Sequence, residues 1–269
     1  MQAPSLKDDK PFAVFNEDGK GDVLLVCEHA SATIPSVFAD LGLQQHALSS
    51  HIAWDPGALE LAMSLAKMFD ATLCYQRYSR LLYDCNRPPE SPSAIREKSE
   101  AYDIPVNRNL SALERNQRVE TFYRPFQLGL SSLLDDRKRS GRQTVLVTVH
   151  SFTPVFFGKP RDVEVGILHD VDTRLADAIL AQTDGLNGSY KIRRNEPYGP
   201  EDGVTHTLME YGVQNGLLNV MIEIRNDLLQ TEEEIGVMAG YLGGLISNAL
   251  PPDPNWLGKQ HQTGGRSWQ

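Results

Sequence analysis

Two histidines and a glutamate follow or interrupt apolar runs of this chain. His29 and His150 each come at the end of a run, and Glu223 lies inside another; the runs are residues 23–27, 144–149 and 219–224. Parallel strands of an open α/β sheet deliver their C-terminal ends to one crevice, so we expect the two imidazoles to meet there. Two neutral imidazoles, a carboxylate and one open position are the ligand set of a catalytic zinc ion.

Two acidic residues are candidates for the third metal ligand. Asp55 stands soon after the first run, in Asp-Pro-Gly57. It is either a metal ligand or the N-cap of a helix that has Pro56 at its first position. Glu28 is the substitute ligand if Asp55 is only a cap.

Glu223 also has two interpretations. A buried carboxylate without a partner costs several kcal/mol, so it needs a function or an ion pair. Alternation along a strand places Met221, Glu223 and Arg225 on one side, and Glu223 could pair with Arg225 or Arg80. Beside a zinc ion, which lowers the pKa of bound water to roughly 7, it would instead act as general base.

Several polar residues flank residues 81–83, which we interpret as a short apolar strand. Arg80 precedes it, and Asn86 and Arg87 follow it before two prolines. Two guanidiniums and a carboxamide suit the recognition of a planar carboxylate. The alternative is that the arginines pair with Asp84 or other acids at the surface.

Strands and helices alternate along the chain. We expect strands at 23–27, 71–75, 144–149, 163–168, 190–194 and 219–224, and helices at 55–69, 111–140, 172–182, 205–211 and 231–248. Capping boxes begin the helices at Ser111 and Thr231, and Pro125 kinks or divides the first of these. Residues 90–110 read as a long loop. This order predicts an α/β fold with three layers: a mixed, mostly parallel sheet with helices on both faces.

Composition limits the function classes. The 269 residues show no internal repeat or linker, so we expect one α/β domain, with a polar arm at 1–20 and a flexible tail at 251–269. A net charge of −9 argues against a nucleic-acid partner. No apolar run approaches the roughly 18 residues of a membrane span, and the polar N-terminus lacks a secretory signal. Three scattered cysteines indicate reduced thiols in a cytoplasmic protein. The oligomeric state stays open.

Seven short motifs occur in an order that resembles the N-formylglutamate amidohydrolase family, and they cover residues 23 to 228. They are Val-Cys-Glu-His-Ala-Ser31, Trp-Asp-Pro-Gly57, Tyr-Ser-Arg80, Asp-Cys-Asn-Arg-Pro-Pro89, Val-His-Ser-Phe-Thr-Pro154, Asn-Glu-Pro-Tyr198 and Ile-Glu-Ile-Arg-Asn-Asp227. The resemblance implies a zinc-exopeptidase-like fold, related to carboxypeptidases and aspartoacylases.

The resemblance also implies roles for single residues. His29 and His150 would be zinc ligands, Glu223 the base, and Arg80 the group that polarises the scissile carbonyl. The substrate's carboxylate would be held by further residues of these motifs: Asn86 and Arg87, with Ser151, Tyr198 and Arg225 also expected at the substrate site. Carboxypeptidase-like sites use His-x-x-Glu, but Ala32 follows His29 by three, which leaves Asp55 or Glu28 as third ligand. Tyr211 stands where relatives often have histidine.

The resulting hypothesis is a cytoplasmic, zinc-dependent amidohydrolase with a small N-acyl amino acid as substrate. The simplest reaction is hydrolysis of N-formyl-L-glutamate to formate and L-glutamate, as in histidine degradation. The alternatives are another N-acyl amino acid or small peptide as substrate, and a metal-free carboxylate-binding protein without turnover. A serine hydrolase is disfavoured because Ser31 and Ser151 lack the Gly-x-Ser-x-Gly elbow.

Overall fold

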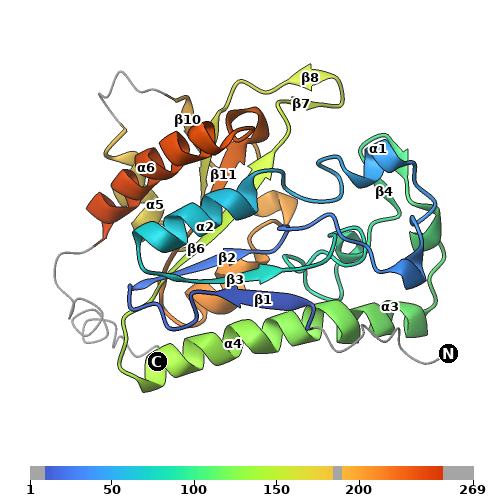
Figure 1. Cartoon of the computed structure of the whole chain (residues 1–269), viewed down its shortest axis with the longest axis horizontal. Helices are drawn as coiled ribbons and strands as arrows, with labels where there is room; N and C mark the ends of the chain where they lie inside the picture. Colours follow the sequence, from blue (N-terminus) through green and yellow to red (C-terminus); the bar gives the residue numbers. More distant parts are fainter. Residues whose placement is uncertain (1–9, 184–189, 251–269) are drawn as a thin grey trace, which may run out of the picture.

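The computed structural model describes residues 10–183 and 190–250, and its centre is a mixed sheet of seven strands (Figure 1). The strand order is β1-β3-β2-β6-β11-β9-β10. Strands β3, β2, β6 and β11 run parallel to one another, whereas β1 is antiparallel to β3 and β9 is antiparallel to β11. The bounds are β1 Phe12–Phe15, β2 Val23–Cys27, β3 Thr72–Gln76, β6 Val145–Phe152, β9 Val165–Leu168, β10 Ile192–Arg194 and β11 Leu218–Arg225.

The sequence explains why the parallel strands lie in the middle. Every residue of β2 and β6 is buried, which is typical of parallel strands covered on both faces. Successive side chains alternate between the two faces: Leu25 and Val147 belong to one core, and Leu24 and Leu146 belong to the other.

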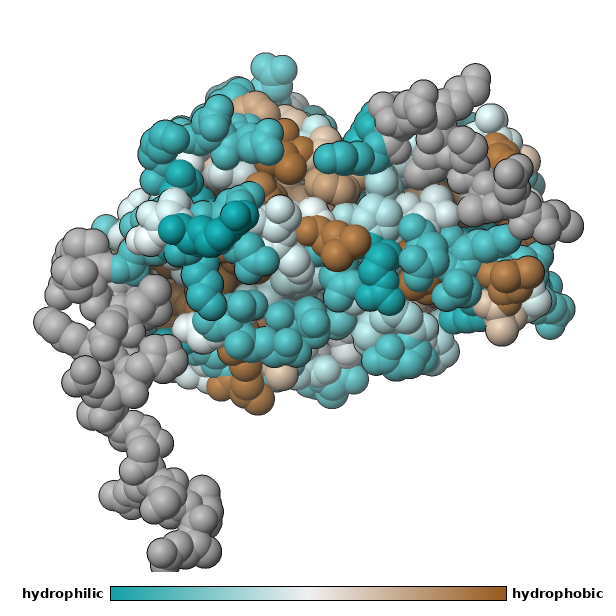
Figure 2. Space-filling model, turned by 90° about the horizontal axis from the view of Figure 1, so that it is seen from below, coloured by the Kyte–Doolittle hydropathy of each residue, from teal (hydrophilic) through white to brown (hydrophobic). Residues whose placement is uncertain are grey.

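Helices cover both faces of the sheet, as expected. On one face lie α2 (Ala58–Met68), α5 (Arg174–Leu180) and α6 (Glu232–Ala249); on the other lies α4 (Arg124–Arg139), preceded by α3 (Ala112–Arg118) (Figure 1). Figure 2 shows the molecule from below, where apolar residues appear as separate spots among hydrophilic ones. The prediction of a three-layer α/β fold is confirmed. Within the described residues, no helix is both long and apolar enough to cross a membrane.

The helical region after Ser111 begins and divides as the sequence predicts. The Ser111 side chain accepts from the Glu114 N–H in a capping box. After α3, one π-helical segment, η4 (Val119–Tyr123), precedes α4, and Pro125 lies in the first turn of α4. Proline has no N–H to donate, so it interrupts the hydrogen-bond ladder of the helix at this junction with η4. The second capping box, at Thr231, begins α6.

Two local expectations were wrong. Residues 81–83 are turns, not a strand, because the Ser79 carbonyl and hydroxyl accept from the N–H groups of Leu82 and Leu81. Part of the expected polar arm is the edge strand β1. Its Phe12 packs edge-on against Phe126 of α4, with ring centroids 6.4 Å apart, and Phe15 packs against the core on the other face.

Short elements surround the C-terminal ends of the parallel strands. The predicted loop after residue 89 contains the hairpin β4 (Lys98–Ser99) and β5 (Tyr102–Asp103) between the turns η2 (Pro92–Ala94) and η3 (Pro105–Asn107). A second hairpin joins β7 (Val155–Phe156) to β8 (Lys159–Pro160). The remaining short elements are η1 (Ser36–Phe38), α1 (Gln45–Leu48), η5 (Pro200–Asp202), η6 (Leu208–Val213) and η7 (Asn226–Leu228).

Candidate active site

A cavity of about 280 Å³ opens at the C-terminal ends of β2, β6 and β11. Its walls include both predicted histidines and Glu223, together with residues from the two hairpins. Ligands of open α/β sheets bind at this edge. The sequence-based expectation that the strand ends bring these side chains together is met by the geometry.

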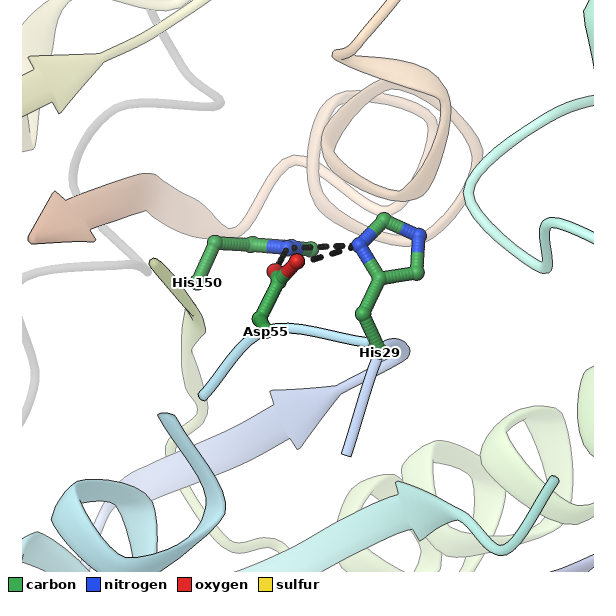
Figure 3. A group of neighbouring side chains, drawn as sticks. All are labelled: His29, Asp55 and His150. Atoms are coloured by element: carbon green, nitrogen blue, oxygen red, sulfur yellow. Dashed lines mark hydrogen bonds and ion pairs between the residues drawn. The ribbon is translucent and has the colours of Figure 1, made fainter. Parts of the chain in front are cut away.

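His29, Asp55 and His150 converge at the base of this cavity (Figure 3). The two Nδ1 atoms lie 3.2 Å apart. Asp55 Oδ2 lies 3.2 Å from Nδ1 of His29 and 2.9 Å from Nδ1 of His150. All three side chains are buried, so these contacts form in a region of low dielectric constant.

Each imidazole has a second carboxylate on its other side. Nε2 of His29 lies 2.7 Å from Asp84 Oδ1, and Nε2 of His150 lies 3.1 Å from Glu28 Oε2. An Nε2–H that faces a carboxylate leaves Nδ1 without a proton in the neutral ring. In that tautomer the two Nδ1 atoms and Asp55 Oδ2 are three acceptors that face one another, and a cation between them, either a proton or a metal ion, offsets their repulsion.

The electrostatics of the cluster also favour a positive charge between these three residues. Burial alone would lower the pKa of His150, but Glu28 and Asp55 raise it well above its ordinary value. Burial would raise the pKa of Asp55, and the two histidines and Arg80 lower it instead. The site therefore favours positive charge, either as a proton or as a metal ion.

The donor set fits zinc. Nitrogen and carboxylate ligands about 2.0–2.2 Å from a tetrahedral zinc ion lie about 3.3 Å from one another, close to the 2.9–3.2 Å separations here. Carboxylates that hold the far nitrogen of a metal-binding histidine are the usual second layer of such sites. Asp84 and Glu28 occupy those positions, so Asp55, not Glu28, joins the two histidines as candidate ligand.

Asp55 is free for this role because it does not cap α2. The N-cap is Gly57, at φ +79°, and α2 begins at Ala58. A Cβ at Gly57 would lie 2.5 Å from Leu229 Cβ, so glycine is required both for the turn and for the packing. The Asp55 N–H donates to the His29 carbonyl (2.9 Å), which ties this turn to the end of β2.

Glu223 lies beside the cluster. It is the register partner of His150 on the neighbouring parallel strand, so both side chains emerge on the same face. Its Oε2 is buried and finds no hydrogen-bond partner among the residues described. Burial raises the pKa of Glu223 to about 7, with Asp55 adding to the effect and His150 opposing it. A carboxyl group tuned near neutrality in a cleft suits a general base.

Arg80 pairs with two acids of the cluster. Its Nη1 lies 3.2 Å from Asp55 Oδ1 and its Nη2 lies 3.1 Å from Asp84 Oδ2. Burial would lower the pKa of Arg80, but these two acids raise it. The acid-pair alternative from the sequence is thus correct for Arg80, although the pair lies inside the site rather than at the surface. Its guanidinium still lines the cavity.

The expected substrate-binding residues divide into two groups. Four of them line the cavity: Asn86, Arg87, Ser151 and Tyr198. The Asn86 amide is engaged with the backbone of Val204 and Thr207, and the Ser151 hydroxyl donates to the Pro56 carbonyl.

Arg225 belongs to the second group. It lies outside the cavity lining and pairs with Glu164 (3.3 Å) and Asp227 (2.8 Å). Tyr211 is likewise absent from the cavity lining and is buried in the core beneath α4.

Sequence reasoning missed several residues of the site. Asp84 was considered only as a partner of arginine, yet it binds His29. His51, Arg96 and Glu100 also line the cavity. Arg96 could have been considered from the sequence, because it lies in a long predicted loop and long loops of compact domains often line binding sites.

The fold and this cluster define an α/β protein with a candidate metal centre at the C-terminal edge of its parallel strands. The N-formylglutamate amidohydrolase family model matches residues 21–230, and the chain belongs to this family. Membership supports amidohydrolase activity on a small molecule. No curated protein matches the chain.

Two of the crystal structures that resemble the chain come from Agrobacterium tumefaciens and Ralstonia eutropha JMP134. Gene product Atu2144 from Agrobacterium tumefaciens is 56% identical, with a TM-score of 0.89, over 92% of this chain and 98% of its own. N-formylglutamate amidohydrolase from Ralstonia eutropha JMP134 is 18% identical, with a TM-score of 0.66, over 90% of this chain and 97% of its own. The second likeness is one of fold.

Proposed function

We propose that this protein hydrolyses the formyl amide of N-formyl-L-glutamate to formate and L-glutamate, with zinc held by His29, Asp55 and His150. The observation that carries the proposal is the set of three acceptor atoms within 3.2 Å of one another, backed by two further carboxylates. Zinc, when bound, would act as a Lewis acid on the formyl carbonyl and lower the pKa of water.

Glu223 is the proposed general base. It accepts the proton of the attacking water and passes it to the amine that leaves, which a carboxyl group with a pKa of about 7 can do in both directions. Its lack of a hydrogen-bond partner among the described residues supports this role, because the group is held ready for water rather than used in packing.

The arginines of the site take two roles in this proposal. Arg80 holds Asp55 and Asp84 in place and stabilises the negative charge that develops on the formyl oxygen. Arg87 binds a carboxylate of the substrate. Its Nε donates to Ser93 Oγ (3.2 Å) and its Nη1 to the Asn86 carbonyl (2.8 Å), which fixes the guanidinium at the cavity wall.

We further propose a cytoplasmic location and a role in histidine degradation. Cys27, Cys74 and Cys85 are buried and form no disulfide, as expected of a reducing compartment.

Metal analysis combined with a formate-release assay tests the function. The purified protein should contain about one zinc ion per chain and release formate from N-formyl-L-glutamate; chelation should abolish turnover and added zinc should restore it. Faster release of another acyl group would identify a different substrate. Protein without stoichiometric metal or hydrolysis would be a carboxylate-binding protein instead.

A further inference from the structure

Two arginines of the cavity have no acid partner. Arg80 pairs with Asp55 and Asp84, whereas no ion pair within the described residues involves Arg87 or Arg96. Arg96 Nε is buried, and it has no hydrogen-bond partner among the described residues. Arg87 is buried and Arg96 is half-buried. A positive charge that is shielded from water without a counter-ion is costly, so an anion that binds beside these guanidiniums is favoured.

The other acids of the cavity wall do not neutralise these arginines. Glu100 pairs with His51 (3.1 Å) and accepts from the Phe157 N–H (2.8 Å). Asp202 accepts from the Gly199 N–H (2.9 Å). Burial lowers the pKa of Arg96, and the positive charges of Arg80 and Arg87 lower it further, with Asp84 opposing them. The net lowering is expected of a place that can accept negative charge.

The two arginines lie at different depths. The Arg87 N–H donates to the Asp84 carbonyl (3.0 Å), and the Asp84 side chain binds His29, so Arg87 is attached to the candidate metal centre. Arg96 lines both the cavity and a separate, open hollow at the surface. Arg96 therefore lies at the outer end of the cavity, farther from the candidate metal centre than Arg87. In an N-acyl amino acid, the α-carboxylate is the closer one to the scissile amide and a side-chain carboxylate lies farther away.

The backbone of Arg96 is held firmly. Its carbonyl accepts from Asn107 Nδ2 (2.7 Å), and Arg118 Nη1 in turn donates to Asn107 Oδ1 (2.7 Å). The Ile104 N–H donates to the Glu97 carbonyl (2.8 Å), which closes the hairpin that follows. These contacts fix the backbone of Arg96 at the cavity wall, so that only its side chain has to be ordered when a ligand binds.

We propose that Arg96 binds the side-chain carboxylate of the substrate, with Arg87 on the α-carboxylate, and that this second contact selects N-acyl derivatives of dicarboxylic amino acids. The inference deepens the proposed function and rests on it, because the depth order assumes that the acyl group lies at the cluster of His29, Asp55 and His150.

The test compares N-formyl-L-glutamate with N-formyl-L-glutamine, which keeps the α-carboxylate but has a neutral side chain. In Arg96→Gln the ratio of kcat/KM for the two substrates should fall about 10–100-fold, the range of a lost hydrogen bond to a charged group. Arg96→Lys, which keeps the charge, should retain part of the preference. Arg108→Gln is the matched control, because Arg108 is an exposed arginine of the same segment that pairs with exposed Asp103.

A second measurement separates this inference from the reaction itself. Calorimetric titration with L-glutamate and L-glutamine needs no turnover, and Arg96→Gln should weaken only the binding of L-glutamate. If the wild type released no formate, the proposed function would fail while this titration still decided the role of Arg96. Equal losses for both substrates or both ligands, or an unchanged ratio, would overturn the inference, as would a wild type that binds L-glutamate no better than L-glutamine.

Discussion

Replacement of Glu223 by glutamine removes the candidate base while keeping the size of the side chain. Positioned general bases typically contribute about 10²–10⁴-fold to a rate, so kcat for formate release should fall by that factor. The zinc content should stay at the wild-type level, because the donor atoms belong to His29, Asp55 and His150. Metal analysis and steady-state kinetics measure both quantities. Full activity of Glu223→Gln would refute the assignment of the base.

The same variant should change how stability depends on pH in the metal-free protein. Burial raises the pKa of Glu223 from 4.5 to about 7. Between these values the folded protein keeps a proton that the unfolded chain has released, so the free energy of unfolding falls as the pH rises through this window. One pKa unit corresponds to about 1.4 kcal/mol, so the full decline is about 3 kcal/mol. Glutamine does not ionise, and Glu223→Gln should lack this contribution.

Urea denaturation at pH 5 and pH 8, in the presence of a chelator, measures the difference. The free energy of unfolding of Glu223→Gln, relative to the wild type, should be larger at pH 8 than at pH 5. A relative stability that is the same at both pH values would show that Glu223 is not held in an environment that opposes its charge.

Four further substitutions test the rest of the site. His29→Ala and His150→Ala should each lose most of the zinc that dialysed wild-type protein retains, and an unchanged zinc content would contradict their role as ligands. Asp84→Asn should weaken zinc binding about 10–100-fold in a chelator competition, because it removes the charge behind His29; equal affinity would make Asp84 a packing residue. Arg80→Ala should lower kcat about 10²–10³-fold, as the loss of an oxyanion partner does, and wild-type kcat in this variant would exclude that role.

The centre of the site could be predicted because its residues lie in or just after apolar runs that form neighbouring strands. The runs before His29 and His150 are mostly apolar, and such runs become parallel strands that are covered on both faces, as the burial of every residue of β2 and β6 shows. Because β2 and β6 are neighbours in the sheet, both imidazoles reach the same edge. Glu223 follows from the same logic, since β11 lies beside β6 and places it opposite His150.

The partners behind the histidines could not be predicted from local patterns. Glu28 precedes His29 in sequence but contacts His150, a residue more than a hundred positions away. Asp84 reaches His29 because residues 81–83 turn instead of extending. That turn depends on hydrogen bonds that Ser79 accepts, and the Ser79 hydroxyl in turn donates to the carbonyl of Ala53. Such a contact depends on how two distant loops pack.

Arg225 was expected at the substrate site, but it lies outside the cavity even though the alternation of side chains along β11 was predicted correctly. Alternation along β11 holds, since Ile222 and Ile224 pack in the core on one face while Met221 packs in a separate cluster. At the strand's end, however, Glu164 and Asp227 pair with Arg225 and keep it away from the cavity. Periodicity predicts the face of a residue, but ion pairs at a strand's end decide where a long side chain lies.

The arginines after β3 therefore do not form one carboxylate clamp, although their spacing suggested it. Arg80 is committed to Asp55 and Asp84, and its charge offsets part of the negative charge that surrounds the two histidines. Among the described residues, the hydrogen bonds of the Arg87 guanidinium go to neutral acceptors, the Ser93 hydroxyl and a backbone carbonyl. A guanidinium already paired with two acids gains little from a third, whereas one with neutral partners gains a full charge-assisted bond. We therefore propose that Arg87 recognises the substrate's carboxylate and that Arg80 acts at the reacting centre.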